Sequence, residues 1–231
     1  MGHILLAGGA EFGGRMSESD RRAIELAGGL DAPIRILPTA AAPDNNHIRA
    51  GNHGVRWFKS LGAKNVEVSY VIDKVSAEDE SIAEELRAAR LIYLLGGFPR
   101  FTGETLVHSR VWQSMLEAFE NGAVLAGSSA GAMVLCEHYY DPQAGKLLKG
   151  LGLIPNACVL PHHNHFGKGW AAQLMKHIPV ATLIGIDEGT GAILEGGSAQ
   201  SGRWTVYGAG AVTLYRGGQP KVHARGESFI L

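Results

Sequence analysis

The chain has 231 residues, 45% of them hydrophobic, and a formal net charge of −1 at pH 7. This length is enough to bury one large core, and we expect a single domain over residues 1–231. Nucleic acids and anionic membranes attract proteins with a basic excess, so the charge balance argues against both as partners and favours a small polar molecule.

The start of the chain and its cysteines predict a cytoplasmic protein. The opening MGHILLAGG lacks the length and cleavage pattern of a signal peptide, and no apolar run approaches the ~20 residues that span a bilayer. The only two cysteines, Cys136 and Cys158, both lie between apolar residues, so no disulfide framework is expected.

Short apolar runs alternate with amphipathic runs through the N-terminal part of the chain. The apolar runs, each bounded by Gly, Pro or polar residues, predict buried strands at 3–9, 34–40, 65–72 and 91–97. The amphipathic runs between them predict helices at 17–29, 44–63 and 76–90. This alternation is typical of a doubly wound α/β fold, in which a mostly parallel sheet is flanked by helices.

The pattern changes near the C-terminus, where strand-like segments are separated by Gly-rich turns. These segments are 182–195, 203–216 and 221–231. They predict a C-terminal antiparallel extension of the same sheet and no second domain.

A motif for nucleophilic catalysis lies in the middle of the chain. Residues 108–122 predict a helix, 123–127 a buried strand and 130–137 another helix, so the sequence GSSAG forms a strand-to-helix turn. In a Gly-x-Ser-x-Gly elbow the glycines allow a sharp turn that exposes the middle serine, here Ser129. Ser128 is assigned no chemistry. A tight turn filled with small residues is the alternative interpretation of the same stretch.

A serine nucleophile needs a histidine base, and that base needs an acid to orient it. Histidines are concentrated at His162, His163 and His165, which follow a strand-like segment and are expected on a loop at its end. A metal site and a solvated loop are the alternatives, but no acid at ligand spacing accompanies the cluster to favour a metal. Glu137 and Asp141, just beyond the elbow helix, are the candidates for the acid.

Several segments, in order along the chain, resemble one known family. They are LAGGAE, IRILPTAAA, FKSLGAKNVEVSYVID, LIYLLGGF, GSSAGAMVL, GLGLIPNACVLPHH, GIDEGTGAILE and VYGAGAVTLY. The family is that of the serine peptidases dipeptidase E and cyanophycinase, whose fold is related to class I glutamine amidotransferases but carries Ser in place of Cys. The resemblance covers most of the chain and implies a single catalytic domain that hydrolyses small aspartyl peptides through an acyl-enzyme.

The resemblance also implies a catalytic triad. Ser129 matches the family's nucleophile. His162, after the Gly-Leu-Gly-Leu segment and a short strand, matches its base, and His165 is the second choice. For the acid, the resemblance favours Glu137 over Asp141.

Substrate recognition is less closely defined. The backbone N–H groups of Gly97 and Ala130 are expected to form the oxyanion hole. Dipeptidase E cleaves dipeptides with an N-terminal aspartate, and cyanophycinase hydrolyses β-aspartyl-arginine peptides, so both need a cation that binds a carboxylate. We expect dipeptidase E-like activity, with cyanophycinase-like activity as the alternative. Arg100 and Lys168 are the candidate cations.

Asp187 and Glu188 match a family segment at the edge of the site and are candidates for contact with a substrate amino group, or simply form a turn. The sequence departs from the family at Phe98 and Pro99, where Asn or Asp followed by Gln or Thr is usual. It also departs at Leu160, where cyanophycinase has Asp. These departures argue against cyanophycin itself as the substrate.

Two other classes of protein remain open. One is a non-catalytic binding module on the same fold. The other is a nucleotide-binding protein that uses GGAEFGG, although this loop matches neither of the common phosphate-binding motifs. No cofactor or metal is expected, and a homodimer is the default assembly for such a chain.

Overall fold

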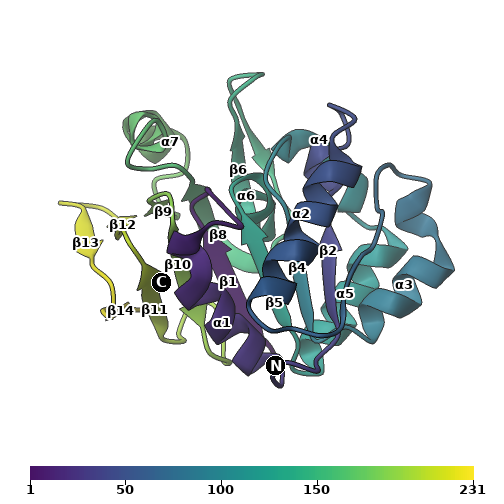
Figure 1. The fold of residues 1–231 in the computed structure, drawn as a ribbon. Coiled ribbons are helices and arrows are strands. Elements are labelled where there is room, and N and C mark those ends of the chain that lie inside the picture. The colour runs from purple at the N-terminus through teal and green to yellow at the C-terminus, as the bar shows by residue number, and fades with distance from the viewer.

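The computed structural model describes residues 1–231 and contains two β-sheets with helices around them (Figure 1). The first sheet has eight strands in the order β14-β11-β10-β1-β5-β4-β2-β3. Strands β1, β5, β4, β2 and β3 are parallel, and β10, β11 and β14 continue the sheet in the antiparallel sense. The bounds are β1 His3–Ala7, β2 Ile34–Leu37, β3 Val66–Val68, β4 Leu91–Leu94, β5 Val124–Ser128, β10 Thr190–Leu194, β11 Trp204–Gly208 and β14 Ser228–Phe229.

Most of the helices form where the sequence places an apolar stripe along one side of a polar segment, whereas α6 is buried on all sides. Two of them begin at a side-chain cap: Asp79 accepts a hydrogen bond from the backbone N–H of Ile82, and Ser109 from that of Trp112. The helices are α1 Ser17–Leu26, α2 His47–Ser60, α3 Glu80–Arg87, α4 Pro99–Leu106, α5 Arg110–Glu120, α6 Ala130–Leu135 and α7 Ala171–His177. None of them is long and apolar enough to cross a bilayer.

A second sheet of six strands, in the order β13-β12-β9-β8-β6-β7, lies beside the first. Its strands are β6 Cys136–Asp141, β7 Lys146–Lys149, β8 Ile154–Leu160, β9 Thr182–Ile186, β12 Val212–Tyr215 and β13 Lys221–His223. The doubly wound α/β class and its antiparallel C-terminal strands are confirmed, but the prediction that all these strands extend one sheet is wrong. The reason lies at residues 187–189, where the chain crosses from one sheet to the other. Strand β9 pairs with β8 in the second sheet, whereas β10 pairs with β1 in the first.

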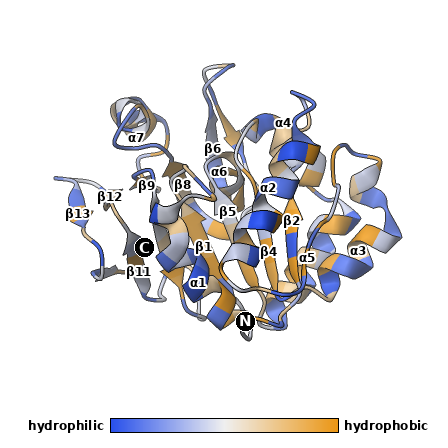
Figure 2. Cartoon of the chain, viewed as in Figure 1, coloured by the Kyte–Doolittle hydropathy of each residue, from blue (hydrophilic) through white to orange (hydrophobic).

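Side-chain packing divides the molecule into layers. One core cluster, which includes Ile24, Phe58 and Tyr93, fills the space between the first sheet and helices α1 and α2. A larger cluster joins the other face of that sheet to α3, α5, α6 and the second sheet. The hydropathy view shows the strands of the first sheet largely apolar and the outer side of α2 hydrophilic (Figure 2). Burial of both faces explains why strands such as β1 and β4 read as continuous apolar runs.

Candidate active site

The stretch GSSAG forms a sharp turn between β5 and α6. Ser129 has a φ of +48° and a ψ of −112°, an unusual backbone conformation for a residue with a side chain. The flanking glycines make the turn possible. A Cβ on Gly127 would lie 2.5 Å from the carbonyl carbon of Gly131, and a Cβ on Gly131 would lie 2.3 Å from the carbonyl oxygen of Leu94. Ser129 is therefore held in a strained, partly exposed position, while Ser128 is buried.

His162 lies beside Ser129, two residues beyond the end of β8. The Oγ atom of Ser129 and Nε2 of His162 are 3.0 Å apart. The backbone N–H of His162 donates to the carbonyl oxygen of Gly8 over 2.7 Å. The imidazole packs against Gly9, where an added Cβ would lie 2.3 Å from its Cε1 atom. The ring is therefore fixed from the β1 side and can accept the proton of Ser129.

The acid that contacts His162 is Glu188. Its Oε1 atom lies 2.7 Å from Nδ1 of His162, and its Oε2 atom lies 3.2 Å from Nε2 of His165. The backbone N–H of Glu188 donates to Oδ1 of Asn164 over 3.0 Å. The hydrogen bond from His162 is the main cause that lowers the pKa of the Glu188 carboxyl. An ionised carboxylate in this position orients the imidazole so that Nε2 faces the serine.

The prediction that Glu137 supplies the acid is wrong. Glu137 accepts a hydrogen bond of 2.8 Å from the backbone N–H of Asn156 and makes no contact with His162. The parallel pairing of β6 with β8 explains this, because it sets Cys136 opposite Ile154, at the start of β8, whereas His162 follows the end of that strand. Glu137 and His162 are thus separated by most of the length of β8.

Asp141, the other candidate for the acid, is also away from the histidine. It is buried at the end of β6, where its Oδ1 atom accepts a hydrogen bond of 3.0 Å from the backbone N–H of Gln143. The structure thus brings neither of the two predicted acids to His162.

The remaining histidines have different surroundings. His163 is buried, with Nδ1 3.3 Å from Oδ1 of Asp187 and Nε2 2.8 Å from the hydroxyl of Tyr215, and its burial lowers its pKa. Asp187 also accepts a hydrogen bond from the backbone N–H of Ala211 over 3.0 Å, so it fastens the histidine loop to the second sheet. The side chain of His165 is 59% exposed and reaches Glu188 rather than Ser129. No group of three or more His, Cys, Asp or Glu side chains is arranged to hold a metal ion.

Two backbone N–H groups lie open near the serine. Gly97 has a φ of +139°, and an added Cβ would lie 2.1 Å from the carbonyl oxygen of Ala40, so only glycine fits there. Its N–H donates to no group of the protein. Ala130 is the first residue of α6, where backbone N–H groups lack partners within the helix. Both are suited to bind an oxyanion.

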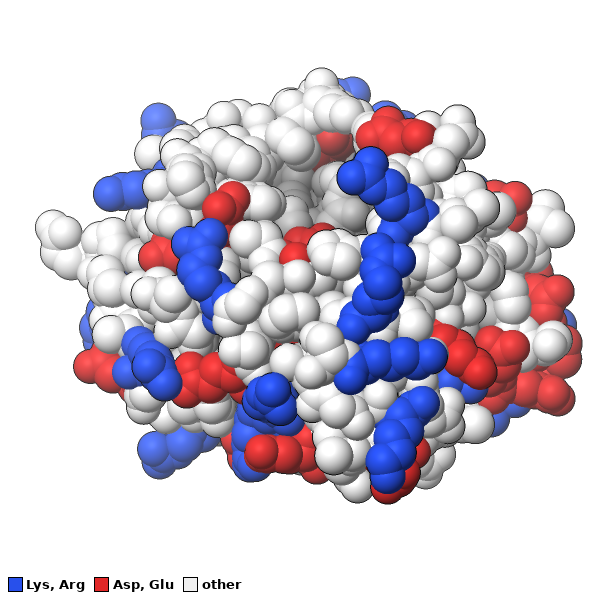
Figure 3. All heavy atoms as spheres, viewed as in Figure 1, with Lys and Arg blue, Asp and Glu red and all other residues white.

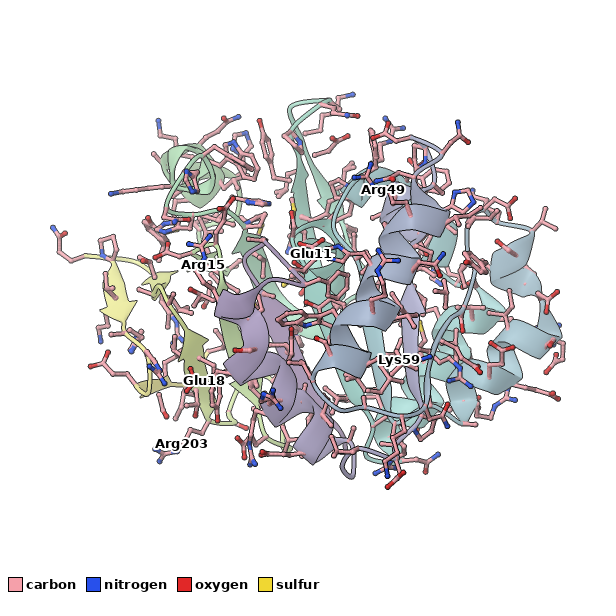
Figure 4. The ribbon with its side chains drawn as sticks, viewed as in Figure 1. Glu11, Arg15, Glu18, Arg49, Lys59 and Arg203 are labelled. Carbon is pink, nitrogen blue, oxygen red and sulfur yellow. The ribbon has the colours of Figure 1, made fainter.

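The cations around the site include one that the sequence did not indicate. Arg100 donates to Glu104 over 2.8 Å on the exposed side of α4, and Lys168 is exposed without an ion pair. Arg15 packs against Gly189, where an added Cβ would lie 3.1 Å from its Nε atom, so it stands next to Glu188. A hollow opens on this face of the molecule (Figure 3), in the region between the labelled Arg15 and Arg49 (Figure 4).

The site contains an elbow serine, a histidine and a carboxylate in hydrogen-bonded series, beside open backbone N–H groups. This arrangement defines a serine hydrolase. The chain belongs to peptidase family S51, whose sequence profile matches residues 4–202. It is therefore a serine peptidase of the family that includes peptidase E and cyanophycinase.

Known relatives agree with this assignment. The chain is 29% identical to cyanophycinase from Geminocystis herdmanii over 225 residues, which cover 93% of this chain and 80% of that protein. It is also 29% identical to cyanophycinase from Trichormus variabilis, over 91% of this chain and 72% of the relative. A peptidase from an acI-B1 Actinobacterium has 30% identity and a TM-score of 0.88, with 100% of this chain and 97% of that chain covered.

A more distant structure shares the fold. It is a candidate peptidase E from Listeria monocytogenes EGD-e, with a TM-score of 0.64 and 18% identity, over 90% of this chain and 99% of that chain.

Proposed function

We propose that this serine peptidase hydrolyses β-aspartyl peptides of small size, with Ser129 as nucleophile, His162 as general base and acid, and Glu188 as the orienting carboxylate. The observation that carries the proposal is the hydrogen-bonded series of the three side chains, with separations of 3.0 Å and 2.7 Å. Glu188 replaces Glu137 in the triad implied by the family resemblance.

The chemistry follows from this geometry. Oγ of Ser129 attacks the scissile carbonyl carbon while its proton moves to Nε2 of His162. The N–H groups of Gly97 and Ala130 stabilise the resulting oxyanion. The imidazolium then gives its proton to the leaving amine, and an acyl ester forms on Ser129. Water, deprotonated by His162, attacks this ester and regenerates the serine.

The choice of a β-aspartyl substrate rests on the relatives. The two relatives from Geminocystis herdmanii and Trichormus variabilis are named cyanophycinases. They favour β-aspartyl peptides as substrates over the α-aspartyl dipeptides that the sequence motifs favoured. Arg15, next to Glu188 and without an ion pair, is the cation we assign to the aspartyl carboxylate. Phe98, Pro99 and Leu160 depart from the family pattern, so we propose short β-aspartyl peptides rather than the cyanophycin polymer.

The test is the release of free amine from β-Asp-Arg, β-Asp-Leu, Asp-Leu and Ala-Leu. The same panel includes a β-linked and an α-linked peptide that are each one residue longer. We expect cleavage of the β-aspartyl members by the wild-type protein, and a loss of several orders of magnitude in kcat with Ser129→Ala. Ser128→Ala, which removes the neighbouring hydroxyl and its hydrogen bond to Glu11, is the matched control and should retain far more activity than Ser129→Ala. Cleavage of α-aspartyl peptides alone would assign the dipeptidase E-like alternative. Binding without cleavage would assign a binding module.

A further inference from the structure

Glu11 lies beside the nucleophile, on the loop that follows β1. Its Oε2 atom accepts a hydrogen bond of 2.9 Å from the hydroxyl of Ser128, and its Oε1 atom accepts one of 3.2 Å from the backbone N–H of Gly96. A Cβ built on Gly96 would lie 2.9 Å from Oε1 of Glu11 and 3.2 Å from Cβ of Ser129. The carboxylate and the nucleophile therefore border the same small space.

The negative charge of Glu11 has no partner in the protein. The other carboxylates near the triad have histidine partners: Glu188 contacts His162 and His165, and Asp187 contacts His163. No Lys, Arg or His nitrogen lies within 4.0 Å of Glu11. Each of its oxygens has one protein donor, which leaves lone pairs free on both. Its side chain is only partly buried, and Figure 4 places it at the middle of the face that carries the hollow of Figure 3.

The backbone holds Glu11 in place at the cost of strain. The residues on either side, Ala10 and Phe12, have φ values of +56° and +60°, in the left-handed region that residues with side chains rarely adopt. The ring of Phe12 is anchored against Tyr93 and Phe58, at centroid distances of 5.3 Å and 6.2 Å. Strain of this kind persists only where the surrounding structure enforces it, and it is concentrated at functional sites.

We propose that Glu11 binds a cationic group of the substrate next to the scissile bond. This inference rests on the proposed peptidase function and adds a specificity residue to it. A lone carboxylate beside a developing oxyanion opposes the reaction of a neutral substrate, because like charges repel. A substrate ammonium or guanidinium would neutralise Glu11 and so favour both binding and the attack by Ser129. The enzyme therefore selects peptides that carry a positive charge at this position.

The test compares wild-type enzyme with Glu11→Gln on four peptides: β-Asp-Arg, N-acetyl-β-Asp-Arg, β-Asp-citrulline and N-acetyl-β-Asp-citrulline, each in the length that the wild-type enzyme cleaves. Citrulline keeps the size of arginine but removes its charge, and acetylation removes the charge of the α-ammonium. The Gln side chain retains one acceptor oxygen for the hydrogen bonds of the loop. Glu18→Gln is the matched control, since Glu18 also accepts a backbone N–H bond, from Gly208 over 3.1 Å, but lies on α1.

We expect Glu11→Gln to lower kcat/KM by about 10- to 100-fold, mainly through KM, for peptides that carry the bound cation, and by less than about two-fold for N-acetyl-β-Asp-citrulline, which carries no cation. A loss confined to the two arginine peptides identifies the guanidinium as the bound group. A loss confined to the two peptides with a free amino group identifies the ammonium. Glu18→Gln should leave all four rates unchanged.

Two results would overturn the inference: an equal loss on all four peptides, which would mean that Glu11 only positions the loop, or no loss on any. If the variant does not fold, the wild-type preference for peptides with the cationic group over N-acetyl-β-Asp-citrulline should still decline as NaCl is raised. A preference absent at low salt would reject the inference. Cleavage of N-acetyl-β-Asp-citrulline by wild-type enzyme tests the peptidase function separately.

Discussion

Replacing Glu188 by Gln tests the triad most directly. The 2.7 Å separation between Glu188 and Nδ1 of His162 is that of a charge-assisted hydrogen bond. Gln fills the same space, but its amide group can donate to Nδ1 and so hold the imidazole with its proton on Nε2, where it cannot accept a proton from Ser129. In trypsin-like enzymes with a buried acid the equivalent change lowers kcat by about 10⁴-fold. The Glu188 side chain is 23% exposed, so water can compensate for part of the loss. We expect a loss of about 10³-fold, which corresponds to about 4 kcal/mol.

The assay is kcat/KM for amine release at constant pH, with folding checked by the midpoint of urea unfolding. Glu137→Gln is the control, because the Glu137 side chain contacts the backbone N–H of Asn156 and the side chain of His138 but not the triad, and should change kcat/KM by less than about two-fold. The reasoning would be refuted if Glu188→Gln kept more than a tenth of the wild-type activity while folding normally. A large loss with Glu137→Gln alone would restore the original assignment of the acid.

Two further changes have definite expected outcomes. Burial raises the pKa of Asp20 to about 7, while its Oδ2 atom accepts a bond of 2.7 Å from Nε1 of Trp57. Because the unfolded chain loses this proton near pH 4 and the folded chain near pH 7, the free energy of unfolding should fall as pH rises between these values, and Asp20→Asn should remove that contribution in urea titrations. Gly9→Ala would place a methyl group 2.3 Å from Cε1 of His162, so kcat/KM should fall by about 100-fold or more, while the free energy of unfolding falls by only about 1–3 kcal/mol.

The sequence predicted the first sheet well and the second poorly, for physical reasons. Strands buried on both faces must be apolar throughout, so β1 and β4 stand out against their polar flanks. In contrast, α6 ends at Leu135 and β6 begins at Cys136 with no Gly, Pro or polar cluster between them. The run AGAMVLCE therefore reads as one helix. Only the pairing of β6 with β8, a contact between distant parts of the chain, makes its last residues a strand.

The site, like the second sheet, could be predicted only in part from the sequence, but one rule about strand ends points to the carboxylate that contacts His162. Ser129 is marked by a local motif and His162 by the family resemblance, but the acid is defined by which strand ends meet. Strands β8 and β9 are parallel, with Leu160 opposite Gly185, so their carboxyl ends lie side by side. His162 follows the end of β8 by two residues, and Glu188 follows the end of β9 by two residues. Functional side chains in such sheets lie beyond the carboxyl ends of strands. Glu137 stands near the start of its strand, so topology alone excludes it, although it is closer to Ser129 in the sequence.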